Sequence, residues 1–235
     1  SPRGELDDYT DHKLFAGISG YGSKTFYDLM FDYKRGHDSI SGNGLDDNLE
    51  AYDTWDRYAL LGSLTYGRPD ARLNLRVDGE LTKQEQDELK SIDYDTQGLG
   101  AQLGVRVGGK TRAVLEGGLR RYDYVNSTQS GDRYYARIGA TWEATEKTTG
   151  IVTYGREKFN ADNPGTPLES DEFGPAFGTN EDTSNSTWRG DIHWEIRTRD
   201  TLRLFTYKGT RVSSGTGSNK VSTQYGIDWK HDWSE

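Results

Sequence analysis

The sequence contains no cysteine, one methionine and five prolines among its 235 residues. The absence of cysteine excludes a disulfide scaffold and any zinc site built on cysteine ligands. The sequence also lacks any apolar run near the roughly 18 residues that a transmembrane helix requires. The protein is therefore expected either to be soluble or to cross a membrane by a route other than a helix.

A basic surface is missing as well, since 38 acidic residues outnumber 29 basic ones and give a net charge of −9. This balance argues against nucleic acid as a partner. The mean hydropathy of −0.91 is too low for an ordinary packed core, so much of the chain must stay in contact with water. The sequence has instead 29 glycines, 15 tyrosines and 6 tryptophans, a usage typical of strands.

Apolar and polar residues alternate along most of the chain. Between residues 188 and 197, tryptophan and isoleucine occupy one parity, and arginine, aspartate and glutamate occupy the other. The same alternation is found at 71–78, 99–107, 133–142 and 221–230, and in less regular form at 12–21, 25–36, 56–67, 111–124, 147–158 and 201–212. The pattern predicts an all-β chain of about eleven strands without helices.

The connections between the expected strands alternate in length. Short turns are predicted at 22–24, 68–70, 108–110, 145–147 and 199–200, and long polar loops near 37–54, 84–95, 125–132, 159–186 and 213–219. Short turns at one end of the sheet and long loops at the other are typical of outer-membrane barrels. We therefore expect an antiparallel up-and-down transmembrane β-barrel, with residues 1–235 forming a single domain.

In such a barrel the apolar parity faces lipid and the charged parity faces a water-filled lumen. The residues expected to line the pore are Arg72, Arg76, Asp78, Arg106, Arg112, Glu116, Arg120, Arg137, Arg189, Asp191, Glu195, Arg197 and Asp228. The residues expected to face lipid are Leu73, Leu75, Leu103, Val105, Ile138, Ala140, Trp142, Ile192, Trp194, Ile196, Ile227 and Trp229. Lumen charges can select solutes, and they can also pair across strands and stiffen the wall.

Two further expectations follow from the pattern. A soluble, half-buried antiparallel sheet shows the same alternation with its apolar parity buried, and it remains the alternative to a membrane barrel. If the short turns are periplasmic, the chain starts in an external loop, whereas intact bacterial barrels have an even strand number and both termini periplasmic. The chain is therefore expected to be part of a larger barrel, incomplete at both ends.

The sequence contains no strong motif for catalysis or for binding of phosphate or metal. The segment 104–111, GVRVGGKT, matches the P-loop pattern, but an alternating strand follows it where a phosphate site needs a helix, so a hairpin turn is predicted. The four histidines are scattered, and the acidic clusters lack the spacing of a calcium loop. No nucleophile elbow is present. We predict no catalytic residue, no metal and no cofactor.

Four segments resemble a β-barrel porin family of Gram-negative outer-membrane proteins: 108–124, 134–160, 186–210 and 222–235. The resemblance covers the chain from about residue 95 onward. It rests chiefly on the Trp-x-Ala-Thr-x-Lys-Thr-Thr hairpin from Trp142 and the Tyr-Gly-x-x-Trp-x-His-x-Trp strand from Tyr225.

Some members of this family are associated with secretion of exopolysaccharide or capsule. The resemblance therefore implies an outer-membrane location and a non-enzymatic passage for exopolysaccharide, with membrane lipid and periplasmic export proteins as partners. A general diffusion porin with 159–186 as its constriction loop is an alternative, as is a non-conducting barrel that anchors adhesive surface loops.

Overall fold

One antiparallel sheet makes up the computed structural model, which describes residues 10–39, 52–68, 70–87, 90, 93–125, 130–145, 147–162, 182–212 and 219–233. The strands are β1 (His12–Tyr21), β2 (Thr25–Ser39), β3 (Tyr52–Tyr66), β4 (Leu73–Gln86), β5 (Tyr94–Arg106), β6 (Thr111–Tyr124), β7 (Gly131–Thr145), β8 (Thr148–Ala161), β9 (Thr183–Arg197), β10 (Asp200–Val212) and β11 (Asn219–His231). The described residues contain no helix with the length and hydropathy that a membrane span requires.

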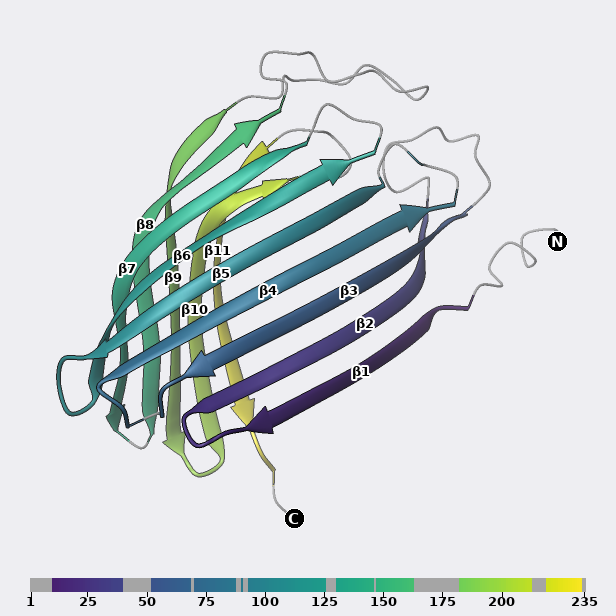
Figure 1. The fold of residues 1–235 in the computed structure, drawn as a ribbon. Coiled ribbons are helices and arrows are strands. Elements are labelled where there is room, and N and C mark those ends of the chain that lie inside the picture. Colours follow the sequence, from purple (N-terminus) through teal and green to yellow (C-terminus); the bar gives the residue numbers. More distant parts are fainter. Residues whose placement is uncertain are drawn as a thin grey trace.

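Each strand pairs with the next one in the chain, so the order in the sheet is β1 to β11 and every pairing is antiparallel. This result confirms the prediction of an all-β, up-and-down chain of about eleven strands. The sheet curls strongly, so that β9–β11 lie behind β1–β5 across its hollow side (Figure 1). Strands β1 and β11 are not paired with each other, and the sheet is open.

The connections alternate in length as predicted. Short turns join the strands at one end, at 22–24, 67–72, 107–110, 146–147 and 198–199, and longer connections join them at the other end, at 40–51, 87–93, 125–130, 162–182 and 213–218. The loop expected at 84–95 is shorter, because β4 and β5 continue beyond their apolar residues as pairs of polar residues such as Gln84 and Tyr94. Apolar alternation marks only the part of a strand that needs an apolar face.

The segment that matches the P-loop pattern forms a hairpin turn at 107–110 between β5 and β6. The backbone N–H groups of Val107 and Gly108 both donate to the carbonyl of Thr111, at 3.1 and 3.2 Å, and the chain continues directly into β6. A phosphate cradle needs its lysine at the start of a helix. The hairpin prediction is therefore confirmed.

Gly67, directly after β3, has a φ of +102°, in the region that side chains rarely adopt. A Cβ there would lie 2.5 Å from the carbonyl oxygen of Leu73. We expect Gly67→Ala to lower the free energy of unfolding by about 1–3 kcal/mol. Gly109→Ala is the matched control, because a Cβ at Gly109 meets nothing within 4 Å. Urea unfolding of both variants tests the prediction, and equal stabilities would contradict it.

The strand registers carry one parity across the whole sheet. On one face, Asp78 lies opposite Gly100, Gly100 opposite Gly118, and Gly118 opposite Tyr135. On the other face, Leu75, Leu103, Leu115 and Ile138 form a row in the same way. In strands β4 to β7 these two rows therefore keep polar residues, glycine and tyrosine on one face and aliphatic residues on the other.

The charged face is the concave one. Its side chains reach across intervening strands: Arg120 of β6 pairs with Glu80 of β4, and Arg133 of β7 donates to the hydroxyl of Tyr207 of β10 at 3.2 Å. The contact of Arg133 with Tyr207 passes over two intervening strands, which only the inside of a strongly curved sheet allows. We call this the concave face and the opposite, apolar surface the convex face.

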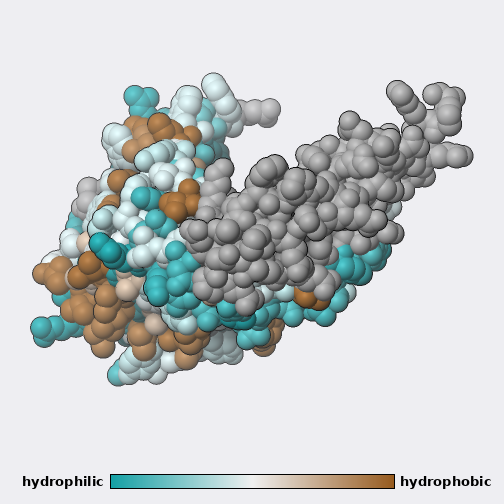
Figure 2. Space-filling model, turned by 90° about the horizontal axis from the view of Figure 1, so that it is seen from above, coloured by the Kyte–Doolittle hydropathy of each residue, from teal (hydrophilic) through white to brown (hydrophobic). Residues whose placement is uncertain are grey.

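Burial is inverted relative to a water-soluble protein. Among the described residues, four apolar and eleven polar or charged residues are buried, whereas convex side chains such as Leu115, Ile138 and Ile227 are largely exposed. Figure 2, which looks down on the molecule from above, shows hydrophobic residues gathered along its left and lower outer border. Soluble domains bury the opposite class of residue.

Candidate functional site on the concave face

The concave face carries most of the residues predicted to line a pore. The register aligns them on this face in strands β4 to β11: Arg76, Asp78, Arg106, Arg112, Glu116, Arg120, Arg137, Arg189, Asp191, Glu195 and Asp228. Arg72 precedes β4, and its carbonyl accepts a hydrogen bond from the backbone N–H of Arg106 at 2.8 Å. That these side chains border a solute pathway remains a prediction.

The convex face carries the residues predicted to face lipid. The register places on it Leu73, Leu75, Leu103, Val105, Ile138, Ala140, Trp142, Ile192, Trp194, Ile227 and Trp229. Their contact with lipid remains a prediction.

Arg197 and Ile196 depart from the predicted alternation. A register shift lies between Asp200 and Thr201, so that Thr201 pairs with Glu195 while Asp200 pairs with Arg197. Ile196 has no partner in this ladder. Arg197 pairs with Asp200, and Asp200 pairs on its other side with His231, which has the same parity as the convex residue Trp229. Grouping Arg197 with the pore-lining residues was therefore wrong in register, because a bulge inserts one extra residue and reverses the parity beyond it.

One fully buried charge on the concave face is the carboxylate of Glu157. Its side chain is 0% exposed and that of its partner Arg133 is 12% exposed. The Nε of Arg133 donates to Oε2 of Glu157 at 2.8 Å, and the backbone N–H of Thr210 donates to Oε1. Pairing of β9 with β10 ends at Trp188 and Lys208. The Glu157 carboxylate thus supplies a hydrogen-bond acceptor to β10 where its ladder to β9 has ended.

A second buried pair lies nearer the middle of the face. The Nε of Arg137 donates to Glu116 at 3.0 Å, and the hydroxyl of Thr153 donates to the same carboxylate oxygen at 3.2 Å. The guanidinium of Arg137 also lies 4.6 Å from the ring centre of Tyr135. Such charge-assisted bonds fix the side chains that border the hollow side of the sheet.

Two further ion pairs are more open. Arg203 donates to both carboxylate oxygens of Asp191, at 3.0 and 2.6 Å, and lies 3.6 Å from Asp228. Arg120 reaches Glu80 across Gly98, where the absence of a side chain leaves room for the guanidinium. The concave charges are therefore largely paired, which agrees with the structural role considered from the sequence.

Sequence reasoning missed several concave residues, chiefly Arg57, Arg133, Glu157, Arg203 and Tyr207. All of them lie on the polar parity of their strands, so the signal was present. They lie in the less regular segments or near strand ends, where the apolar parity is interrupted. Following the register from strand to strand would have found them.

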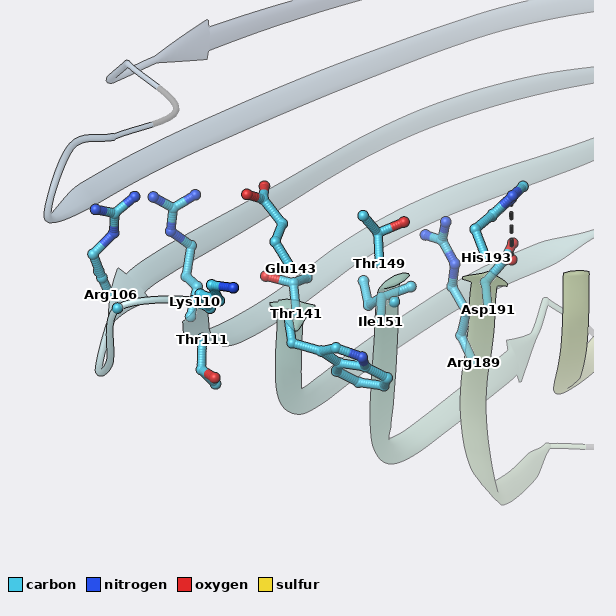
Figure 3. Close-up of a pocket in the computed structure, with 14 residues that line it drawn as sticks. Arg106, Lys110, Thr111, Thr141, Glu143, Thr149, Ile151, Arg189, Asp191 and His193 are labelled. Carbon is cyan, nitrogen blue, oxygen red and sulfur yellow. Dashed lines mark ion pairs between the residues drawn. The ribbon is translucent and has the colours of Figure 1, made fainter. Parts of the chain in front are cut away.

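Three hollows follow one another along the concave face, and we call them together the concave groove. The first, of 370 Å³, lies near the short turns and is lined by Arg106, Lys110, Arg112, Glu143, Arg189 and His193 among others. In Figure 3, Arg106, Glu143, Arg189 and His193 point to one side of the sheet, while Thr111 points to the other.

The second hollow, of 710 Å³, shares Ile151 and Arg189 with the first. The third, of 250 Å³, shares Glu80 and Arg120 with the second and lies toward the long connections. The concave groove is thus a continuous, mostly polar track from one end of the sheet to the other.

Along the strands, the convex face carries a central apolar band with aromatic residues at its two borders. On β7, Tyr134 and Trp142 lie at the two borders with Ile138 between them, and on β3 Tyr58 and Tyr66 lie eight residues apart. Beyond the border nearer the long connections the convex parity becomes charged. Lys83 pairs there with Glu85 at 2.9 Å, and Arg121 with Asp123 at 2.7 Å.

Comparison with known proteins identifies similar solved structures. The sequence matches no family model and no curated protein. OmpT, an outer membrane protein of Vibrio cholerae, is 9% identical with a TM-score of 0.48, over 94% of this chain and 89% of that one. The CymD monoaromatic hydrocarbon channel is 10% identical with a TM-score of 0.45, over 96% and 77%.

The ferric-catecholate import receptor Fiu from E. coli K12 is 12% identical with a TM-score of 0.43, over 93% of this chain and 49% of the receptor. This chain therefore spans about half the length of that receptor. Structural similarity thus extends to several outer-membrane proteins. No specific family is identified, and the comparisons do not identify the porin family that the hairpin and strand motifs resemble.

Proposed function

We propose that the chain forms the wall of an outer-membrane β-barrel that provides a passage for polysaccharide. The observation that carries the membrane assignment is the inverted burial, with an exposed convex band of apolar side chains and two buried ion pairs on the concave face. In water the convex band would be a large exposed apolar surface, which soluble monomers avoid. In a bilayer the same band meets hydrocarbon and needs no covering protein.

The height of the band supports this assignment. The eight residue steps from Tyr134 to Trp142 span about 26 Å along a strand. At the strand tilt of about 40° found in such barrels, this corresponds to about 20 Å along the membrane normal, close to the usual apolar band of about 25 Å. Tyrosine and tryptophan at both borders match the aromatic girdles at the two membrane interfaces.

The passage is assigned to the concave groove. Its hydrogen-bonding side chains and its arginines suit hydroxyl-rich and acidic solutes rather than apolar ones. An enclosed lumen requires that the edges β1 and β11 pair with each other or with additional strands, since a membrane does not tolerate open sheet edges. The family resemblance implies export with periplasmic partners and a non-enzymatic role. Both are part of the proposal.

A general diffusion porin is the alternative within the same class. Its sign would be a constriction loop inside the lumen, and the candidate predicted for it, 159–186, lies mostly outside the described residues. Planar-bilayer conductance of the protein, with and without added oligosaccharides, distinguishes the two. Stepwise channels that oligosaccharides block support the polysaccharide passage, while channels insensitive to them favour the diffusion porin. Inserted protein without channels would favour an anchoring barrel.

Arg189 offers a test of the groove as an ion pathway. It is exposed on the concave face and lines both the first and the second hollow. We expect Arg189→Gln to shift the reversal potential toward weaker anion preference, while the free energy of unfolding changes by less than about 0.5 kcal/mol.

Arg156→Gln removes the same charge from an exposed convex position and is the matched control. Its reversal potential should equal that of the wild type. Equal shifts in both variants, or a large stability loss in Arg189→Gln with unchanged selectivity, would count against the lumen assignment.

A further inference from the structure

The third hollow of the concave groove has a small floor and tall walls. The floor consists of Thr82 and Thr96, which lie side by side in the register and are 5% and 4% exposed. The row toward the long connections runs Arg57, Gln84, Tyr94 and Tyr124 from β3 to β6. Small residues in the centre of a ring of long ones create a depression of 250 Å³ in the sheet surface itself.

Three tyrosines border this depression. Tyr94 and Tyr124 lie with ring centres 5.5 Å apart, and Tyr122 continues the series one row further along β6. The hydroxyl of Tyr94 donates to the side-chain oxygen of Gln84 at 3.2 Å, which holds that ring in place. Tyrosine offers an apolar ring face together with a polar tip. Such a wall suits a ligand with both apolar faces and hydroxyl groups.

The charge of the depression is not balanced among the described residues. Arg120 is paired with Glu80, but Arg57 forms no ion pair with any carboxylate in the described part of the chain. The Nε of Arg57 is buried and has no hydrogen-bond acceptor there. The neighbouring cation Lys34, which lies opposite Arg57 in the register, is paired with Asp32 at 3.1 Å. One positive charge therefore remains for a ligand.

We infer that this depression is a subsite for one acidic sugar unit of a polysaccharide, with its carboxylate on Arg57 and its ring against Tyr122. Arginine presents paired N–H groups that match a carboxylate, and a pyranose ring has apolar C–H faces that pack on an aromatic ring. The volume lies below the roughly 300–1,000 Å³ of sites for drug-sized ligands. The inference deepens the proposed passage and rests on it, since it names the substrate class as acidic glycans.

The test uses single-channel block of the protein by two probes of equal length, an oligogalacturonate and a neutral malto-oligosaccharide. We expect Arg57→Gln to raise the half-blocking concentration of the oligogalacturonate about ten- to a hundredfold. The same variant should change block by the neutral probe less than about twofold. Tyr122→Leu should weaken block by both probes about tenfold, because both pack a ring on the tyrosine.

Lys34→Gln is the matched control, because it removes one positive charge from the same face beside Arg57 without lining the depression. It should change neither half-blocking concentration by more than about twofold. Equal effects of Arg57→Gln and Lys34→Gln, or no effect of Arg57→Gln, would overturn the subsite while leaving the passage intact.

Failure of the passage itself has a separate sign, the absence of channels from inserted protein. In that case calorimetric titration of the folded protein in detergent with the oligogalacturonate decides the subsite alone. Binding that Arg57→Gln abolishes supports it, and absence of binding overturns it.

Discussion

Ile138→Arg is expected to destabilise the folded protein in lipid vesicles by about 2–4 kcal/mol. Ile138 lies on the convex face of β7, four residues from Tyr134 and four from Trp142, and is 67% exposed. If the aromatic borders mark the membrane interfaces, this position is near the bilayer midplane, where an arginine costs most. Reversible urea unfolding in vesicles measures the change.

Val125→Arg is the control for this variant. Val125 is 66% exposed, as Ile138 is, but follows β6 on the side of the long connections, beyond the apolar band. The same substitution there should cost less than about 0.5 kcal/mol. A water-soluble sheet predicts small and similar effects at both positions, since their exposure is equal. That outcome would refute the membrane assignment of the convex face.

Glu157→Gln is expected to lower the free energy of unfolding by about 3–5 kcal/mol. The change leaves the Arg133 guanidinium buried without its counter-charge and weakens the acceptor for the backbone of Thr210. Removing one partner of a buried pair is costly, whereas removing both is often tolerated. The double variant with Arg133→Gln should therefore recover part of the loss. Equilibrium unfolding of the wild type, the two single variants and the double variant measures the coupling energy between the two side chains.

Glu195→Gln removes a carboxylate from an exposed position on the same face and should change stability by less than about 0.5 kcal/mol. If Glu157→Gln were equally mild, the buried pair would not stabilise the wall, and the concave charges would have to be explained by solute passage alone.

The strands and their faces could be predicted because a two-residue period is a local property. The alternation in β4, β5, β7 and β9 located the strands, and the same parity placed Ile138 and Glu116 on opposite faces. Most of the short turns were recognisable from their glycine, proline or aspartate residues, whereas 145–147 contains none of these. The long polar extensions of the strands were missed, since outside an apolar band both parities are polar.

Two contacts of the concave face could not be predicted, because they join strands that are not neighbours: Arg120 with Glu80, and Arg133 with Tyr207. Whether Arg133 meets Tyr207 depends on the curvature of the sheet and on where the pairing of β9 with β10 ends. The depression around Arg57 likewise depends on four registers at once. The parity of Arg197 changed through a single bulge that no residue pattern announced.

The most direct test of the account is labelling of single cysteines, which the absence of native cysteine makes unambiguous. The variants are Leu115→Cys and Ile138→Cys on the convex face, and Asp78→Cys and Gln102→Cys on the concave face. In protein inserted into lipid vesicles, a membrane-impermeant maleimide should react with the two concave cysteines and leave the convex ones unmodified. Rapid reaction of the convex cysteines with protection of the concave ones would show that the apolar face does not meet lipid, and would contradict the membrane barrel.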